Sequence, residues 1–120
     1  MASTALTVFS DVLDDLGVVV LTVRGPVDGY TCDLLQKKIN QSIIDGQHRI
    51  ILDLSGVDYI SSAGLGVFIA ARNKAQEDDG MIVLLNLSKC VREVFKVLSM
   101  DDFLNVAASM AEAIEIFQRK

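Results

Sequence analysis

Two adjacent serines, Ser61 and Ser62, are the side chains of this sequence best placed to take part in chemistry. They follow the apolar run Ile50–Leu54, which is typical of a buried strand, and a helix is expected to begin beside them. The first turn of a helix leaves backbone N–H groups unpaired, and these groups tolerate an anion. Because no second catalytic group accompanies the serines, we expect a serine that another protein modifies. The alternative is that Ser62 only caps the helix.

Other residue types that perform catalysis or bind metals are sparse. His48 is the single histidine, no Asp or Ser stands next to it, and we expect it at an exposed strand start. Ser62 lacks the Gly-x-Ser-x-Gly setting of a hydrolase nucleophile. Cys32 and Cys90 are too few and too far apart for a metal site or a disulfide framework, and they are expected to be small core residues. The chain is therefore predicted to be neither an enzyme nor a metalloprotein.

Two glycines, Gly64 and Gly66, follow the serines and leave the start of the expected helix without bulky side chains. Glycine weakens a helix, so a pair near one end suggests close approach by a partner backbone or a nucleotide phosphate. The pair is not a dinucleotide-binding fingerprint, because Ile69 stands where the third glycine is required. No cofactor is predicted beyond weak nucleotide binding near Gly64.

Composition sets the class of protein. A chain of 120 residues that is 51% hydrophobic, with a single proline, is long enough for one domain spanning residues 1–120. The net charge of −5 argues against direct nucleic-acid binding, which needs clustered Lys and Arg. No window reaches the roughly 20 apolar residues of a membrane span, and the N-terminus lacks a secretory signal. We expect a cytoplasmic protein, not attached to a membrane, that is a monomer or a weak dimer.

Apolar periodicity predicts strands that alternate with helices. Leu6, Val8 and Phe9 alternate ahead of an acidic turn over residues 11–15, and an antiparallel second strand follows. The later strands are separated by helices, so their connections are crossovers and most of the sheet is parallel. In chain order, the other expected elements are strands at 18–23, 50–54, 81–85 and 103–106 and helices at 31–45, 62–77, 88–98 and 109–117.

Capping signals mark the helix ends. Ser88 is placed to begin the third helix, and Ser109 with Glu112 forms a capping box for the last one. Thr31 is placed to begin the first helix, and Gly46 to end it. In the helix from residue 62, the side chains expected to face the core are Leu65, Phe68, Ile69 and Ala71.

Two segments resemble the signature of STAS domains, a family named for sulfate transporters and anti-sigma-factor antagonists. The first is Asp53–Gly66, which reads Asp-Leu-Ser-Gly-Val-Asp-Tyr-Ile-Ser-Ser-Ala-Gly-Leu-Gly, and the second is Gly25-Pro26-Val27-Asp28. The order of strands and helices over almost the whole chain is also similar to that family. The resemblance implies an α/β STAS-like single domain, with a mixed, mostly parallel sheet of about five strands and about four helices.

The resemblance also implies a function. A free-standing domain of this length is most similar to bacterial anti-sigma-factor antagonists, which bind a serine-kinase anti-sigma factor of the GHKL type. Phosphorylation of one serine switches the antagonist off, and a PP2C-type phosphatase resets it. Alignment on the glycines puts the phosphoacceptor on Ser62, with Ser61 as the alternative. The other function to consider is a constitutive STAS scaffold, or a transporter-associated subunit, without a phosphorylation cycle.

A partner is expected to contact the residues around this serine. Phosphorylation adds about −1.5 to −2 charges at pH 7, and neighbouring carboxylates would add like-charge repulsion. The residues expected to bind the partner are Asp28, Asp58, Ser61, Ser62, Gly64 and Gly66.

Overall fold

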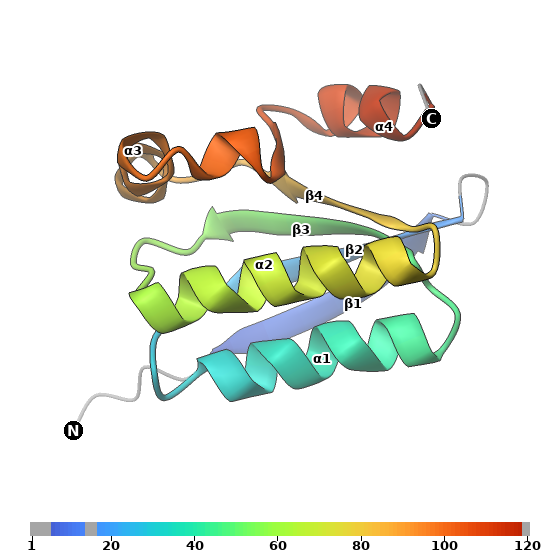
Figure 1. Cartoon of the computed structure of the whole chain (residues 1–120), viewed down its shortest axis with the longest axis horizontal. Coiled ribbons are helices and arrows are strands. Elements are labelled where there is room, and N and C mark those ends of the chain that lie inside the picture. The colour runs from blue at the N-terminus through green and yellow to red at the C-terminus, as the bar shows by residue number, and fades with distance from the viewer. Residues whose placement is uncertain (1–5, 14–16, 119–120) are drawn as a thin grey trace.

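A hairpin of two seven-residue strands, β1 (Thr7–Leu13) and β2 (Val18–Arg24), begins the fold in the computed structural model. The structure describes residues 6–13 and 17–118. Helices then alternate with strands, as the apolar periodicity predicts (Figure 1). The elements that follow are α1 (Cys32–Ile44), β3 (Arg49–Gly56), α2 (Ser62–Glu77), β4 (Met81–Leu85), α3 (Lys89–Val97), a 3-10 turn (Met100–Asp102), β5 (Asn105–Ala107) and α4 (Met110–Gln118).

The five strands form one mixed sheet in the order β1-β2-β3-β4-β5. β1 runs antiparallel to β2, and all the other neighbouring pairs are parallel. This arrangement confirms the predicted α/β class, with five strands and four α-helices among the described residues. None of the described helices is long and apolar enough to cross a membrane.

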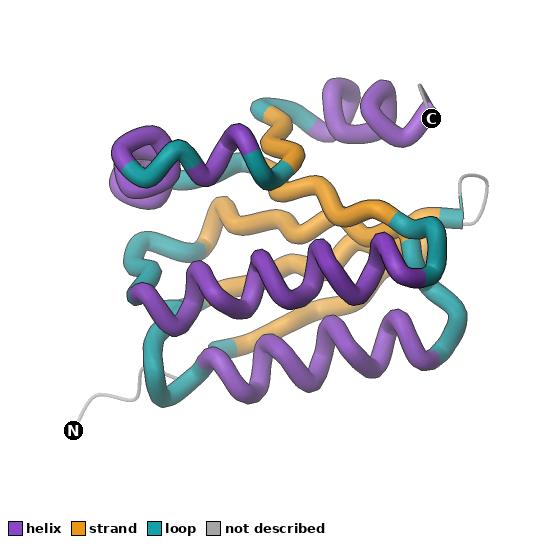
Figure 2. Tube along the Cα trace, viewed as in Figure 1, coloured by secondary structure: helices purple, strands orange, loops and turns teal. Residues whose placement is uncertain are grey.

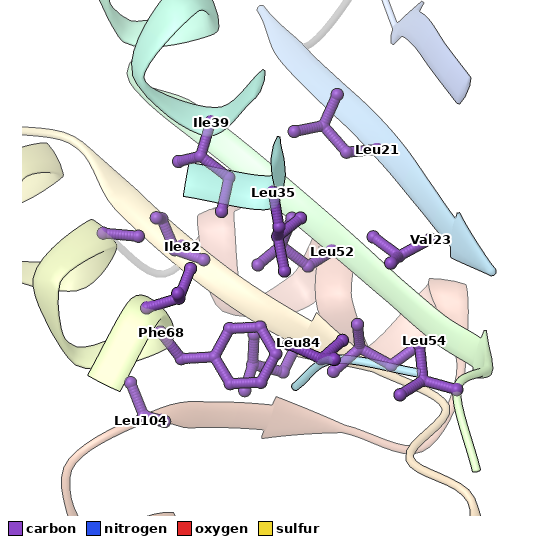
Figure 3. Close-up of a cluster of buried hydrophobic side chains, with 14 of the residues drawn as sticks. Leu21, Val23, Leu35, Ile39, Leu52, Leu54, Phe68, Ile82, Leu84 and Leu104 are labelled. Carbon is purple, nitrogen blue, oxygen red and sulfur yellow. The ribbon is translucent and has the colours of Figure 1, made fainter. Parts of the chain in front are cut away.

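Both faces of the central strands are buried, as the continuous apolar runs predict. On one face, Leu52 and Leu84 of the sheet pack with Leu35 of α1 and Phe68 of α2 (Figure 3). The centroids of the Phe68 and Phe95 rings lie 6.3 Å apart, and this contact joins α2 to α3. On the other face, α4 covers a smaller cluster that consists of Val18, Val20, Ile51, Val83, Leu85, Ala107, Ala113 and Phe117. Packing against the first face of the sheet therefore positions α1 and α2 over the central strands.

Most helix boundaries follow the predicted capping residues. Ser88 Oγ accepts the Val91 N–H at 3.4 Å, and Ser109 Oγ accepts the Glu112 N–H at 3.2 Å. Gly46 follows α1 with φ +92°, a conformation that favours glycine.

Two predictions about side-chain burial are wrong. Ile69 is 39% exposed, although it was expected to face the core. The buried stripe of α2 runs through Val67 and Phe68 instead, so position 69 turns toward solvent. Cys90 is exposed near the start of α3, and Cys32 is only half-buried. Cys32 packs against the larger core cluster at the start of α1, so the predicted core position is wrong for Cys90 alone.

Three predictions near element boundaries also need correction. β1 continues through Asp11, which pairs with Val20, so the acidic turn begins later than predicted; residues 14–16 lie outside the described residues. The last strand begins at Asn105, because Phe103 belongs to the turn before it. His48 is half-buried, with Nδ1 3.8 Å from Asp78 Oδ2, because the end of α2 folds back against the start of β3.

Candidate functional site

The β2–α1 and β3–α2 loops are bound to each other at the carboxyl end of the sheet. Val27 pairs with Ile60 in an isolated parallel bridge. The Val27 N–H donates to the Tyr59 carbonyl at 3.0 Å, and the Ser61 N–H donates to the Val27 carbonyl at 2.9 Å. The parallel pairing of β2 and β3 therefore resumes beyond the strand ends. Figure 2 shows both loops at the same end of the sheet, where α1 and α2 begin.

The two serines have different structural roles. Ser61 is the N-cap of α2: its Oγ accepts the Gly64 N–H at 3.3 Å, and its backbone is extended. Ser62 is the first helical residue and is exposed. Among the described residues, the Ser62 hydroxyl has no hydrogen-bond partner. The alternative that Ser62 is the capping residue is therefore wrong, because Ser61 makes that bond.

Removing the cap should weaken the helix start. Ser61→Ala is expected to lower the free energy of unfolding by about 1 kcal/mol, because the Gly64 N–H loses its partner. Ser61→Asn should retain most of the stability, since asparagine caps about as well as serine. Urea unfolding followed by circular dichroism measures both variants. Equal stability of Ser61→Ala and the wild type would contradict the capping role.

The two glycines of α2 also differ. A Cβ built on Gly64 would lie 2.7 Å from Val27 Cγ1, 2.8 Å from the Val27 carbonyl oxygen and 2.9 Å from Ile60 Cγ1. A Cβ on Gly66 would meet nothing within 4 Å. Gly64 is buried and lets α2 lie against the β2–α1 loop, so its side-chain position faces that loop and not a partner. Gly66 is exposed and is the glycine that leaves room on the surface.

Asp28 organises the β2–α1 loop. Its Oδ1 accepts the Tyr30 N–H at 2.9 Å and the Thr31 N–H at 3.1 Å. The Thr31 hydroxyl in turn donates to the Pro26 carbonyl at 2.7 Å. Thr31 precedes α1 as predicted, but its side chain makes no capping bond to that helix because it closes this loop instead. Asp28 thus closes the turn ahead of α1.

Asp58 lies in the β3–α2 loop, four residues before Ser62, and is exposed. Asp28 directly follows Val27, whose carbonyl binds the Ser61 N–H. The Val27–Ile60 bridge therefore brings both carboxylates to the end of the sheet where α2 begins. No group of three or more metal-ligating side chains occurs among the described residues. The site consists of an exposed hydroxyl, backbone N–H groups and two carboxylates.

Two aromatic residues outside the predicted site lie in the same loops. Tyr30 is 97% exposed and Tyr59 is 56% exposed. Exposed aromatic side chains often anchor protein interfaces. The sequence held a usable signal: Tyr30 stands two residues after Asp28, and Tyr59 directly follows Asp58. Neither loop position is part of an apolar pattern that would require an aromatic ring. Tyr59 lies three residues before Ser62 in the β3–α2 loop, so an exposed aromatic ring stands close in sequence to the exposed hydroxyl.

A family model described as the STAS domain matches residues 9–113. The chain belongs to the STAS domain family. Its relatives include BtrV of Bordetella bronchiseptica, a candidate anti-sigma factor antagonist that is 31% identical over 85% of this chain and 88% of its own length. The anti-sigma-B factor antagonist of Staphylococcus aureus is 27% identical over 70% of this chain and 78% of its own length. Both of these relatives are thus described as antagonists of anti-sigma factors.

Solved structures share the fold. A candidate anti-sigma factor antagonist of Thermotoga maritima superposes with a TM-score of 0.86 at 23% identity, covering 93% of this chain and 95% of that one. The Bacillus anti-sigma factor antagonist SpoIIAA has been solved unphosphorylated and phosphorylated, and each form superposes with a TM-score of 0.68. The unphosphorylated form is 21% identical and covers 94% of this chain and 96% of its own; the phosphorylated form is 23% identical and covers 91% and 97%.

Proposed function

We propose that this chain is an anti-sigma factor antagonist that is switched off by phosphorylation of Ser62. The observation that carries the proposal is the exposed Ser62 hydroxyl at the first position of a 16-residue helix. A kinase can reach this hydroxyl without opening the fold. The antagonist relatives, one of which exists in a phosphorylated form, support the same class of function.

Ser62 is a better acceptor than Ser61 for a structural reason. The Ser61 oxygen already accepts the Gly64 N–H, and its side chain is partly buried. Phosphorylation of Ser61 would place a larger group against the first turn of α2 and disturb the cap. Phosphorylation of Ser62 would neither crowd the first turn of α2 nor disturb the cap, because this hydroxyl is exposed and makes no hydrogen bond within the described part of the chain.

The phosphate would act on the interface and not on the fold. It adds about −1.5 to −2 charges, and the positive end of the helix dipole accommodates that charge within the monomer. A bound partner would cover the same surface, where the dianion loses its hydration and meets the Asp28 and Asp58 carboxylates. Each 1.4 kcal/mol of lost binding energy lowers affinity about tenfold, so a few kcal/mol suffice to release a partner.

The partners follow from the class of function. The unphosphorylated chain would bind an anti-sigma factor that is itself a serine kinase of the GHKL type, and so free a sigma factor in the cytoplasm. A PP2C-type phosphatase would restore the unphosphorylated form. The chain itself would have no catalytic activity. The partner surface would comprise Asp28, Asp58, Ser62 and Gly66, together with the exposed ring of Tyr59.

Mass spectrometry of the protein purified from its own cells tests the site. We expect one phosphate on the intact chain and a phosphopeptide that maps it to Ser62. The Ser62→Ala variant should lack the phosphate, whereas the Ser61→Ala variant should retain it. A phosphate on Ser61 would overturn the assignment of the acceptor. A chain that stays unmodified during growth and stress, even with its phosphatase deleted, would favour the constitutive scaffold instead.

A further inference from the structure

The two edges of the sheet differ in length and cover. β5 (Asn105–Ala107) forms one edge with only three residues. β1 (Thr7–Leu13) forms the other edge with seven residues and pairs, within the described part of the chain, with β2 alone. A seven-residue edge presents a row of backbone N–H and C=O groups that another strand can bind. Helix α1 contributes Leu35, Ile39 and Ile43 to the larger core cluster.

β1 lacks the devices that usually protect an edge strand. Its sequence, Thr-Val-Phe-Ser-Asp-Val-Leu, contains no Pro, Lys or Arg, and Asp11 is its one charged residue. Phe9 is 59% exposed and Val12 is 44% exposed. Pairing with another strand would give these two exposed side chains cross-strand contacts, which stabilise a sheet most when they involve aromatic or β-branched residues. The edge therefore favours an extended partner with apolar side chains.

The sequence of β1 allows the strand to pair with a second copy of itself about Ser10. In an antiparallel pair centred on this residue, Val8 lies opposite Val12 of the second copy and Phe9 lies opposite Asp11. All seven residues then pair, the two valines of each copy meet on one face, and no like charges are opposed. Centring the pair on Asp11 would instead oppose two carboxylates and leave Thr7 and Val8 without partners. Charge thus excludes the Asp11-centred pair, and only the Ser10-centred pair uses all seven residues of the strand.

We propose that β1 is a homodimer interface, at which two copies pair antiparallel about a two-fold axis through Ser10. The two sheets then form one continuous sheet. Thr7 lies opposite Arg24, so the N-terminal end of β1 is at the same end of the sheet as the Ser62 site. In the antiparallel pair the N-terminal ends of the two β1 strands are at opposite ends. The two Ser62 sites therefore lie at opposite ends of the joined sheet. Each site stays open to its own partner. The dimer is thus a bivalent form of the domain, and its existence does not depend on phosphorylation.

Disulfide trapping tests the register directly. Cys32 and Cys90 are first replaced by serine, and a cysteine is then introduced by Ser10→Cys or, as the matched control, Asp11→Cys. Residues directly opposite have Cβ atoms about 5 Å apart and can form a disulfide, whereas diagonal neighbours lie about 7–8 Å apart. We expect Ser10→Cys to cross-link at least about tenfold faster than Asp11→Cys under mild oxidation. Equal rates, or a faster Asp11→Cys, would overturn the Ser10-centred pairing.

Sedimentation equilibrium of the full chain tests the association itself. The average mass should rise with concentration from the 13.0 kDa of one chain toward twice that value. Ser10→Lys should abolish the rise by opposing two cations across the axis, while Asn73→Lys, on the exposed face of α2, should not. Circular dichroism verifies that both variants fold. A mass that stays at one chain up to about 1 mM, where even weak association is detectable, would overturn the proposal.

Discussion

Ser62→Asp is expected to weaken binding to the anti-sigma factor at least about tenfold, which corresponds to about 1.4 kcal/mol. The variant places one negative charge at the first position of α2, where the partner surface is proposed to lie. Burial against a partner would remove that charge from water, and the Asp28 and Asp58 carboxylates would add repulsion. The loss should be smaller than with a phosphate, because one carboxylate carries about half the charge. Isothermal titration calorimetry with the purified anti-sigma factor measures the change.

Two variants control for effects on the fold. Ser62→Ala should bind as tightly as the wild type and stay in the binding-competent state when the kinase and ATP are present. Ser61→Asp should fold normally, because aspartate is as good an N-cap as serine, and should weaken binding less than Ser62→Asp. If Ser62→Asp binds as tightly as the wild type while Ser61→Asp does not, the acceptor has been assigned to the wrong serine.

Gly64→Ala is expected to lower the free energy of unfolding by about 1–3 kcal/mol, the usual cost of overpacking. The added methyl group would lie within 3 Å of Val27 and Ile60, including the Val27 carbonyl oxygen. The Val27 carbonyl belongs to the backbone and cannot rotate away as a flexible side chain can. The N-terminus of α2 must therefore move away from the β2–α1 loop. The better helix propensity of alanine, about 1 kcal/mol, offsets only part of this cost. Urea unfolding measures the stability.

Gly66→Ala is the matched control two residues further along the same helix. Nothing lies within 4 Å of the Cβ position, so only helix propensity changes and stability should rise by about 0.5–1 kcal/mol. Opposite signs for the two substitutions would support the close contact at Gly64. If both variants gain stability equally, the packing of α2 against Val27 is looser than the structure indicates.

The elements could be predicted because their signals are local. The run Ile50–Leu54 and the strand Met81–Leu85 are apolar on both faces, and both are buried in the sheet. Ser88 and Ser109 stand where helices begin, and their hydroxyls accept the expected N–H groups. Such patterns depend on residues within one turn or one strand of each other. Local patterns therefore sufficed for the order of elements and the parallel sheet.

The details of the site depend on contacts between distant segments. Gly64 and Gly66 are the same residue type two positions apart, and only the Val27–Ile60 bridge makes one of them indispensable to packing. Likewise, sequence suggested a helix start near Ser62, but the choice of Ser61 as cap depends on the geometry that this bridge imposes. Helix boundaries are uncertain by a residue or two when only local patterns are used. For a phosphorylation site, that uncertainty separates the capping serine from the free one.

The most direct test of the account compares the affinity of two forms of the same protein for the anti-sigma factor. One form is unmodified, and the other carries a phosphate on Ser62 that the kinase itself has added and mass spectrometry has mapped. Calorimetry should show an affinity at least about 100-fold lower for the phosphorylated form, or about 2.8 kcal/mol, with unchanged circular dichroism. Equal affinities of the two forms would contradict the phosphorylation switch, whatever the occupancy of Ser62 in cells.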